Sequence, residues 1–298
     1  MQNLILFSVA AVLAFTPQKE LSAQVSSSVE DLITIYREDA GALSRKYAVE
    51  HSEQYISRFS DLYSDWLNRL GEINFRELDR SSQVDYLLLK NDLERSQYFL
   101  QADQKRFNEL KKYIPAPQSV MDFITQRRSG VSMEGKQVAN WFNAWNTETE
   151  ALHAALKNTT VFSKKDAGFL ANIIEERREA IEEAYEFYYG YDPDFTWWVE
   201  EPFNALETSL EEYEEAVQNH FDQEKEQTDE SGIVGSPIGE EEIIRRLGFE
   251  MISYNPQQLI DIANEQYAWT YNEMLKASRE IGYGDDWKAA LEHVKKTY

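Results

Sequence analysis

The sequence predicts an all-α fold, an antiparallel helical array of about 8–11 helices with short loops and no substantial sheet. Three observations predict it. Apolar residues recur at steps of three and four along most of the chain. Glycines and prolines fall mainly between these stretches, where they end or begin helices. No stretch alternates apolar and polar residues convincingly with the period of two that a half-buried strand shows.

The first 23 residues have the pattern of an export signal. Residues 4–15 form an apolar run that is too short to span a membrane, and Ala23 is a small residue at the expected cleavage point. We expect residues 1–23 to be removed and the remaining protein not to insert into a membrane. The run has no preceding Lys or Arg, so an uncleaved anchor or an ordinary first helix stays an alternative.

The chain has no cysteine. This excludes disulfides, a lipid-modified cysteine anchor, thiolate nucleophiles and cysteine-based zinc sites. An exported protein without disulfides is typical of the bacterial envelope, so a periplasmic or secreted location is expected.

Residues 24–226 are predicted to form one N-terminal helical region. A capping box over residues 27–30 opens the first helix, and the second spans residues 51–70 and ends at Gly71. Asp79 or Ser81 caps a long third helix, which the proline-rich residues 114–117 terminate. Further helices are predicted at residues 117–130, at 133–157 and, with Ser163 as the cap, up to Gly190.

A loop is predicted over residues 191–198, and a helix is predicted to begin at Pro202 and to continue through Val217. Trp197 and Trp198 would then lie together in the loop. After this helix, residues 227–235 are expected to form an acidic linker.

Residues 236–298 contain the clearest signals for where helices begin and end. Ser236 and Asn255 are cap residues, and each is followed by proline, the favoured first helical residue. The glycines of residues 282–284 end the second of these helices, and Asp285 or Asp286 caps the last. Three helices this close in sequence offer one another few partners, so they must pack against something else. If that other part is absent, we expect exposed apolar surface on the last helices and a tendency to associate.

Most of the net charge of −23 comes from about a quarter of the chain. Residues 171–242 contain 23 acidic and 3 basic residues. This argues against nucleic-acid binding, which needs a basic footprint, and against adhesion to an anionic membrane. We interpret this acidic segment as a solvated face that keeps the protein soluble. The alternative is an acidic wall for cationic ligands or calcium, although no EF-hand pattern is present.

The sequence assigns no catalytic or metal-binding residue, and ligand-binding residues stay unknown. The four histidines, none of them in a His-Glu-x-x-His arrangement, are His51, His153, His220 and His293. Glu150 and His153 share a helix face, but a di-iron bundle needs two such pairs and two further glutamates. Trp141, Phe142 and Trp145 are predicted to be core. The Trp197–Trp198 pair is either packing or a stacking surface for a sugar.

Several separated blocks of the chain resemble the bacterial domain-of-unknown-function 885 family. The closest are residues 247–260 (LGFEMISYNPQQLI) and 277–291 (ASREIGYGDDWKAAL), followed by residues 78–89 (LDRSSQVDYLLL). Trp197-Trp198 and Glu201-Pro202-Phe203 are similar as well. The resemblance covers roughly residues 29–298, with the blocks in family order.

The resemblance implies a helical zinc-dependent peptidase, often carboxypeptidase-like. The family signature is His-Glu-x-x-Pro-Gly-His-His in the C-terminal half, a segment that would bind zinc and activate water. No residue of this sequence matches that segment, so no catalytic or metal role is carried over. We expect the N-terminal helical portion of such a protein, non-catalytic as it stands. Zinc and a peptide substrate are implied only for the complete protein.

Two alternative hypotheses about the function remain. One is a stand-alone helical binding or scaffold domain of the bacterial envelope. The other is a separate activity, namely sugar or cationic-ligand binding at the Trp197–Trp198 segment and the acidic face.

Overall fold

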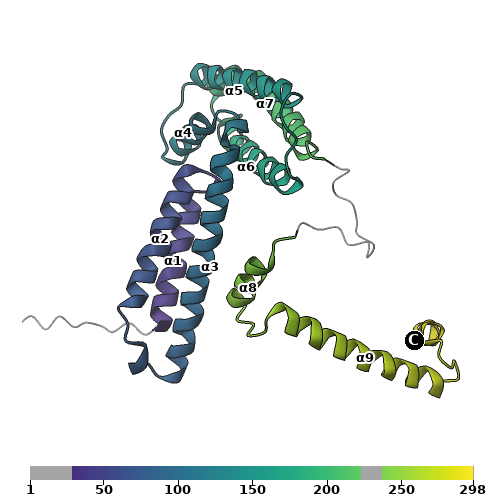
Figure 1. Cartoon of the computed structure of the whole chain (residues 1–298). Helices are drawn as coiled ribbons and strands as arrows, with labels where there is room; N and C mark the ends of the chain where they lie inside the picture. The colour runs from purple at the N-terminus through teal and green to yellow at the C-terminus, as the bar shows by residue number, and fades with distance from the viewer. Residues whose placement is uncertain (1–28, 223–236, 298) are drawn as a thin grey trace, which may run out of the picture.

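The computed structural model describes residues 29–222 and 237–297. These ranges form ten α-helices and two short 3₁₀ turns, and their only strand-like pairing is an isolated bridge between Phe162 and Phe221 (Figure 1). The predicted all-α array is confirmed. Across the same two ranges, no helix combines the length and apolar character needed to cross a bilayer. The predicted export signal and acidic linker lie outside the described residues.

The first three helices form an elongated bundle of their own: α1 (Val29–Lys46), α2 (Glu53–Gly71) and α3 (Arg80–Leu110). Local caps fix two of their starts. The Ser52 hydroxyl accepts from the backbone N–H of Tyr55, and the Asp79 carboxylate accepts from that of Ser82. The core of this bundle consists of Tyr36, Phe59, Leu62, Trp66, Leu70, Leu89 and Leu93.

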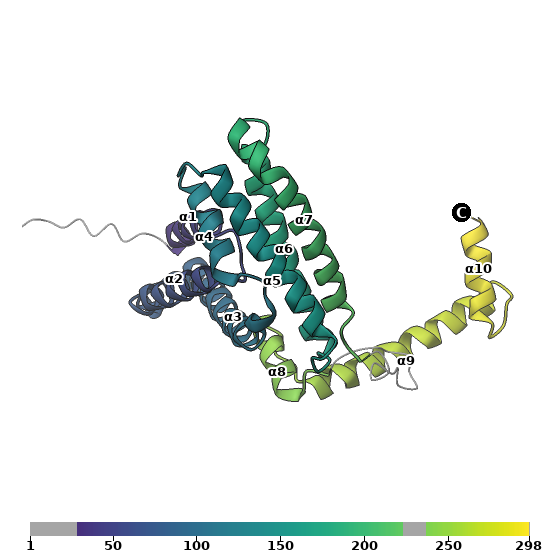
Figure 2. The ribbon, with the colours of Figure 1, turned by 90° about the horizontal axis from the view of Figure 1, so that it is seen from above.

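The next four helices form a second bundle: α4 (Pro117–Arg128), α5 (Gly135–Leu156), α6 (Lys164–Tyr188) and α7 (Pro193–Gln218). Helices α5, α6 and α7 run side by side along most of their length (Figure 2). Phe142 and Trp145 are buried in the core, as predicted, and Trp141 packs against it. Phe107 and Leu110, at the end of α3, belong to this second core, so the two bundles meet there.

The predicted start of α7 is wrong by about two and a half turns. The helix begins at Pro193, so Trp197 and Trp198 lie in its first turns rather than in a loop, and Pro202 lies inside it. The Asp192 carboxylate accepts from the N–H groups of residues 194 and 195 and starts the helix early. Phe195 and Val199 are fully buried, and this burial offsets the backbone hydrogen bond that Pro202 cannot donate.

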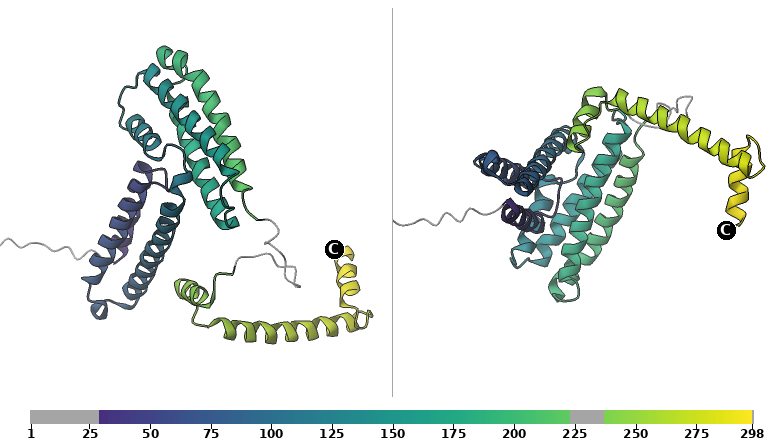
Figure 3. Two further views of the ribbon diagram at one scale, coloured as in Figure 1. Left: turned by 45° about the horizontal axis from the view of Figure 1, so that its top comes forward. Right: turned by 90° about the horizontal axis from the view of Figure 1, so that it is seen from below.

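Three further helices follow the second bundle: α8 (Glu240–Phe249), α9 (Pro256–Glu280) and α10 (Trp287–Thr297). Helix α8 begins at Glu240 rather than just after Ser236, which lies outside the described residues. Asn255 forms the predicted capping box, and Asp286 is the residue that caps α10. Helix α9 runs away from both bundles, and α10 lies crosswise at its far end (Figures 2 and 3).

Candidate functional site

The four histidines are far from forming one centre. Each packs against a different aromatic ring: His51 on Phe169, His153 on Tyr213, His220 on Phe162, and His293 on Tyr283. Glu150 accepts from the amide of Asn146 on its own helix instead of pairing with His153. No group of three or more His, Asp or Glu side chains that could hold a metal ion occurs in the described part of the chain.

His51 makes the most specific polar contact among these histidines. It lies just before α2, and its Nδ1 is 2.9 Å from both carboxylate oxygens of Glu176 on α6, so the pair joins the two bundles. Burial lowers the pKa of His51, but the hydrogen bond and the charge of Glu176 together outweigh it and hold the pKa above the usual value. The stabilising effect of this ion pair, here named the His51–Glu176 tie, therefore depends on pH.

We expect the His51–Glu176 tie to weaken as the pH rises. A raised folded-state pKa gives stability that is fully present below about pH 6.5, the unfolded value, and that is lost as the pH passes the folded value. The thermal midpoint of the protein, measured from pH 5.5 to 8.5, should fall across this window. The variant His51→Gln should lose this component, whereas His293→Gln should keep it. Identical profiles for the wild type and His51→Gln would contradict the assignment.

The two tryptophans singled out from the sequence do not form a joint stacking surface. Trp197 is 82% exposed on α7. Trp198 is less exposed and lies beneath the ammonium group of Lys136, 5.5 Å from its ring centre. The Trp197 ring therefore lies in solvent, whereas the Trp198 ring contacts Lys136 of α5.

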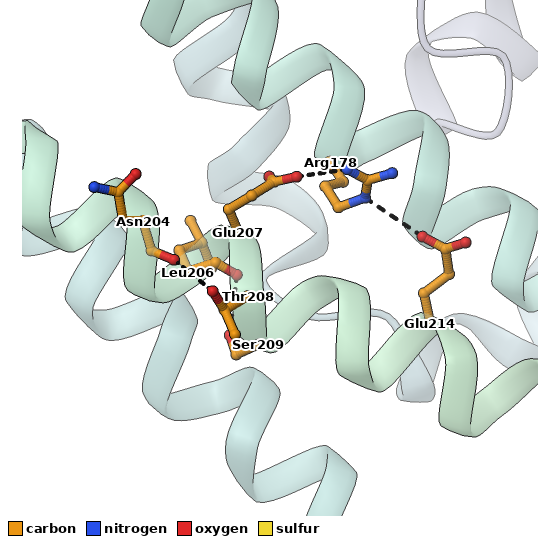
Figure 4. Close-up of polar contacts among 7 residues, drawn as sticks. All are labelled: Arg178, Asn204, Leu206, Glu207, Thr208, Ser209 and Glu214. Atoms are coloured by element: carbon orange, nitrogen blue, oxygen red, sulfur yellow. Dashed lines mark hydrogen bonds and ion pairs between the residues drawn. The ribbon is translucent and has the colours of Figure 1, made fainter.

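The acidic helices α6 and α7 are joined by an arginine. Arg178 on α6 donates to Glu207 at 2.5 Å and to Glu214 at 3.4 Å, both on α7 (Figure 4). Burial raises the pKa of each of these carboxyl groups, although Arg178 opposes the rise. Part of the acidic segment, residues 171–242, therefore joins neighbouring helices and does not form a continuous surface for a cationic ligand.

The most unusual surface of the molecule belongs to helices α8–α10, residues 237–297, here named the C-terminal arm. Helix α8 holds the arm against α3. The Asn91 amide donates to the Phe249 carbonyl at 2.7 Å, and the Tyr98 hydroxyl donates to Glu242 at 2.5 Å. The Phe249 ring packs against Tyr98 and Phe99. These contacts fix the near end of the arm on the first bundle.

The rest of the C-terminal arm is covered very little. Only Ser278 and Ala290 are buried in it. More than half of the large apolar side chains that are exposed in the described ranges belong to the arm. They are Ile238, Ile243, Ile244, Met251, Ile252, Tyr254, Ile260, Ile262, Tyr267, Trp269, Tyr271, Ile281, Tyr283, Leu291 and Val294. The exposure expected from the sequence is confirmed, and its extent is typical of a protein-binding surface.

Some of the exposed apolar side chains lie in the blocks that carry the family resemblance. Residues 247–260 include exposed Met251 and Ile252, and residues 277–291 include exposed Ile281. Residues 78–89, most of which lie on α3, include Val84, Leu87 and Leu88, which are about half exposed. Comparison of the chain with protein-family models, with curated proteins and with solved structures finds no match.

Proposed function

We propose that these helices are the N-terminal frame of an exported protein that resembles the zinc-dependent peptidases of the domain-of-unknown-function 885 family. The frame is non-catalytic, and the zinc-binding His-Glu-x-x-Pro-Gly-His-His segment is supplied by residues outside this chain. The C-terminal arm and the exposed part of α3 then form the surface on which that segment's helical domain packs. The observation that carries the proposal is the large exposed apolar surface of the arm and of α3, part of which lies in the resembling blocks.

The arrangement of α3 supports one continuous packing surface. Along a helix, residues three or four apart lie on one face. The exposed apolar residues of α3 and the residues that hold α8 follow this spacing, in the order Val84, Leu87, Leu88, Asn91, Arg95 and Tyr98. The exposed apolar stripe of α3 therefore continues directly into the part of α3 that contacts α8. A helical domain placed there would contact both.

The coding sequence after the Tyr298 codon tests the proposal directly. An in-frame His-Glu-x-x-Pro-Gly-His-His segment would support it. A stop codon with no such segment downstream would contradict it and would favour a stand-alone binding or scaffold domain.

The 298-residue chain is also expected to bind zinc well below one ion per molecule. Zinc-binding in the family belongs to the signature segment, which supplies the ligands that a tight site needs. Metal analysis of the purified protein after dialysis against trace zinc is the measurement. Tight binding of one zinc ion per chain would overturn the proposed division between frame and catalytic part.

The C-terminal arm is expected to bind the apolar dye ANS. Replacing Ile260 and Tyr267 together by glutamine should lower the dye fluorescence, because both side chains are exposed apolar groups of α9. The matched control is Ile35→Gln, which removes an exposed apolar side chain from α1. Equal dye binding by the wild type and the double variant would contradict the arm as the packing surface. A stable dimer that protects the arm from dye would assign the surface to a second copy.

A further inference from the structure

The junction between the two bundles contains a cavity of about 400 Å³ with a cationic lining. It is formed by the start of α2, the end of α3 with the 3₁₀ turn η2 (Lys111–Tyr113), the start of α4, and α6. The lining includes Lys111, Lys112 and Arg177, against the single acidic residue Glu53. Such an excess of positive charge is notable in a chain of net charge −23.

Arg177 is one of the residues that line this cavity. It is 3% exposed and is the only buried residue with a charged side chain in the described ranges. Burial lowers the pKa of the guanidinium to about 10, while the nearby Glu176 carboxylate raises it, so the group stays protonated at neutral pH. Each further negative charge placed beside a buried cation reduces the cost of its burial.

A second cationic cavity lies nearby, and the helix ends that border it carry the negative end of the helix dipole. It measures about 420 Å³ and is lined by Arg45, Lys46, Arg127 and Arg128. These residues lie at the C-terminal ends of α1 and α4, where basic side chains offset the negative end of the helix dipole. Both Arg127 and Arg128 already pair there with Glu183. The two negative helix ends at this cavity therefore disfavour an anion there.

Helix ends of both signs border the Arg177 cavity. Glu53 and Gln54 are the first residues of α2, and Gln118 lies in the first turn of α4, so two positive helix ends border it, against the one negative end of α3. Phe107 and Met121, both almost fully buried, add apolar walls. The lining thus combines cations, positive helix ends and apolar side chains.

We infer that this cavity binds a small organic anion, an oxyanion head group joined to an apolar body. A guanidinium and two ammonium groups recognise a carboxylate or a phosphate, and the volume fits a small molecule. Glu53 forms an ion pair with Lys111 at 3.2 Å at the rim and competes with the incoming anion. This site is independent of the proposed frame function, since it uses no residue of the C-terminal arm.

Calorimetric titration of the whole chain with hexanoate and, separately, with inorganic phosphate tests the site. We expect saturable binding of at least one probe at millimolar concentration, and the stronger probe identifies the head group. Lys112→Gln should weaken it by about threefold to tenfold, and Glu53→Gln should strengthen it by a similar factor. Because Arg177→Met removes a buried group and can fail to fold, the rim residues carry the test.

The matched control for Lys112→Gln is Lys46→Gln. Each lysine lies over the ring of the tyrosine that follows it, Lys112 at 4.8 Å from Tyr113 and Lys46 at 5.4 Å from Tyr47. Both changes alter the net charge equally, but Lys46 lines the other cavity. Lys46→Gln should leave the affinity unchanged. Absence of binding by both probes, or equal weakening by the two lysine variants, would overturn the inference.

Discussion

Replacing Trp66 by alanine should destabilise the first bundle by about 3–5 kcal/mol, the usual cost of truncating a buried tryptophan. Trp66 is 1% exposed at the centre of the core of α1, α2 and α3, where it packs edge-on against Tyr36. The guanidinium of Arg69 lies over the ring, 4.7 Å from its centre. Small domains have total stabilities of roughly 5–15 kcal/mol, so the loss removes a large part of the total. Urea unfolding followed by far-ultraviolet circular dichroism measures it.

Trp197→Ala is the matched control, because it makes the same chemical change at a side chain that projects from α7 into solvent. Its effect should stay within about 0.5 kcal/mol. Circular dichroism is preferred to fluorescence, because each variant removes a tryptophan. Equal stability losses in the two variants would show that the core assigned to Trp66 is wrong.

Replacing Gly135 by alanine should destabilise the second bundle by about 1–3 kcal/mol, the usual cost of forcing extra volume into a packed contact. Gly135 is the first residue of α5 and lies against the start of α7. A Cβ atom there would be 2.7 Å from the Cα of Phe195 and 2.8 Å from the carbonyl oxygen of Asp194. These are backbone atoms, so no side-chain rotation relieves the clash and the two helices have to move apart.

Gly168→Ala provides a control with the opposite sign. Gly168 lies within α6, and a Cβ added to it meets no atom within 4 Å. Alanine in a helix interior is more favourable than glycine by roughly 0.5–1 kcal/mol, so this variant should be more stable than the wild type. The two midpoints of urea unfolding should therefore shift in opposite directions. A stabilised Gly135→Ala variant would rule out the close approach of α5 and α7.

Helix starts were predicted well where one side chain caps the backbone beside it. Asp79, Ser163 and Asn255 each accept from a backbone N–H three residues later, as their positions in the sequence predict. Such a bond depends only on neighbouring residues, so no knowledge of the tertiary structure is needed. The start of α7 was missed because Pro202 was taken as a first helical residue. The burial of Phe195 and Val199, which favours the earlier start, depends on helices distant in sequence.

The candidate surfaces were predicted unequally. Exposure of the C-terminal arm was expected, because three helices within residues 236–298 offer one another few partners. The stripe of Val84, Leu87 and Leu88 on α3 was not recognised as exposed, since apolar residues at helical spacing usually mark a core. The spacing of three and four residues places these side chains on one helix face, but the local sequence does not show whether another element covers that face.

The sequence by itself determined the helical class, most helix boundaries, the concentration of acidic residues and the absence of the peptidase signature from these 298 residues. These properties are local or compositional. Only the tertiary structure decided the division into two bundles, the His51–Glu176 tie and the cavity around Arg177. The residues that line this cavity come from four helices and one turn, as far apart as Ser52 and Arg177. Such juxtapositions arise from packing of distant segments, which local periodicity does not specify.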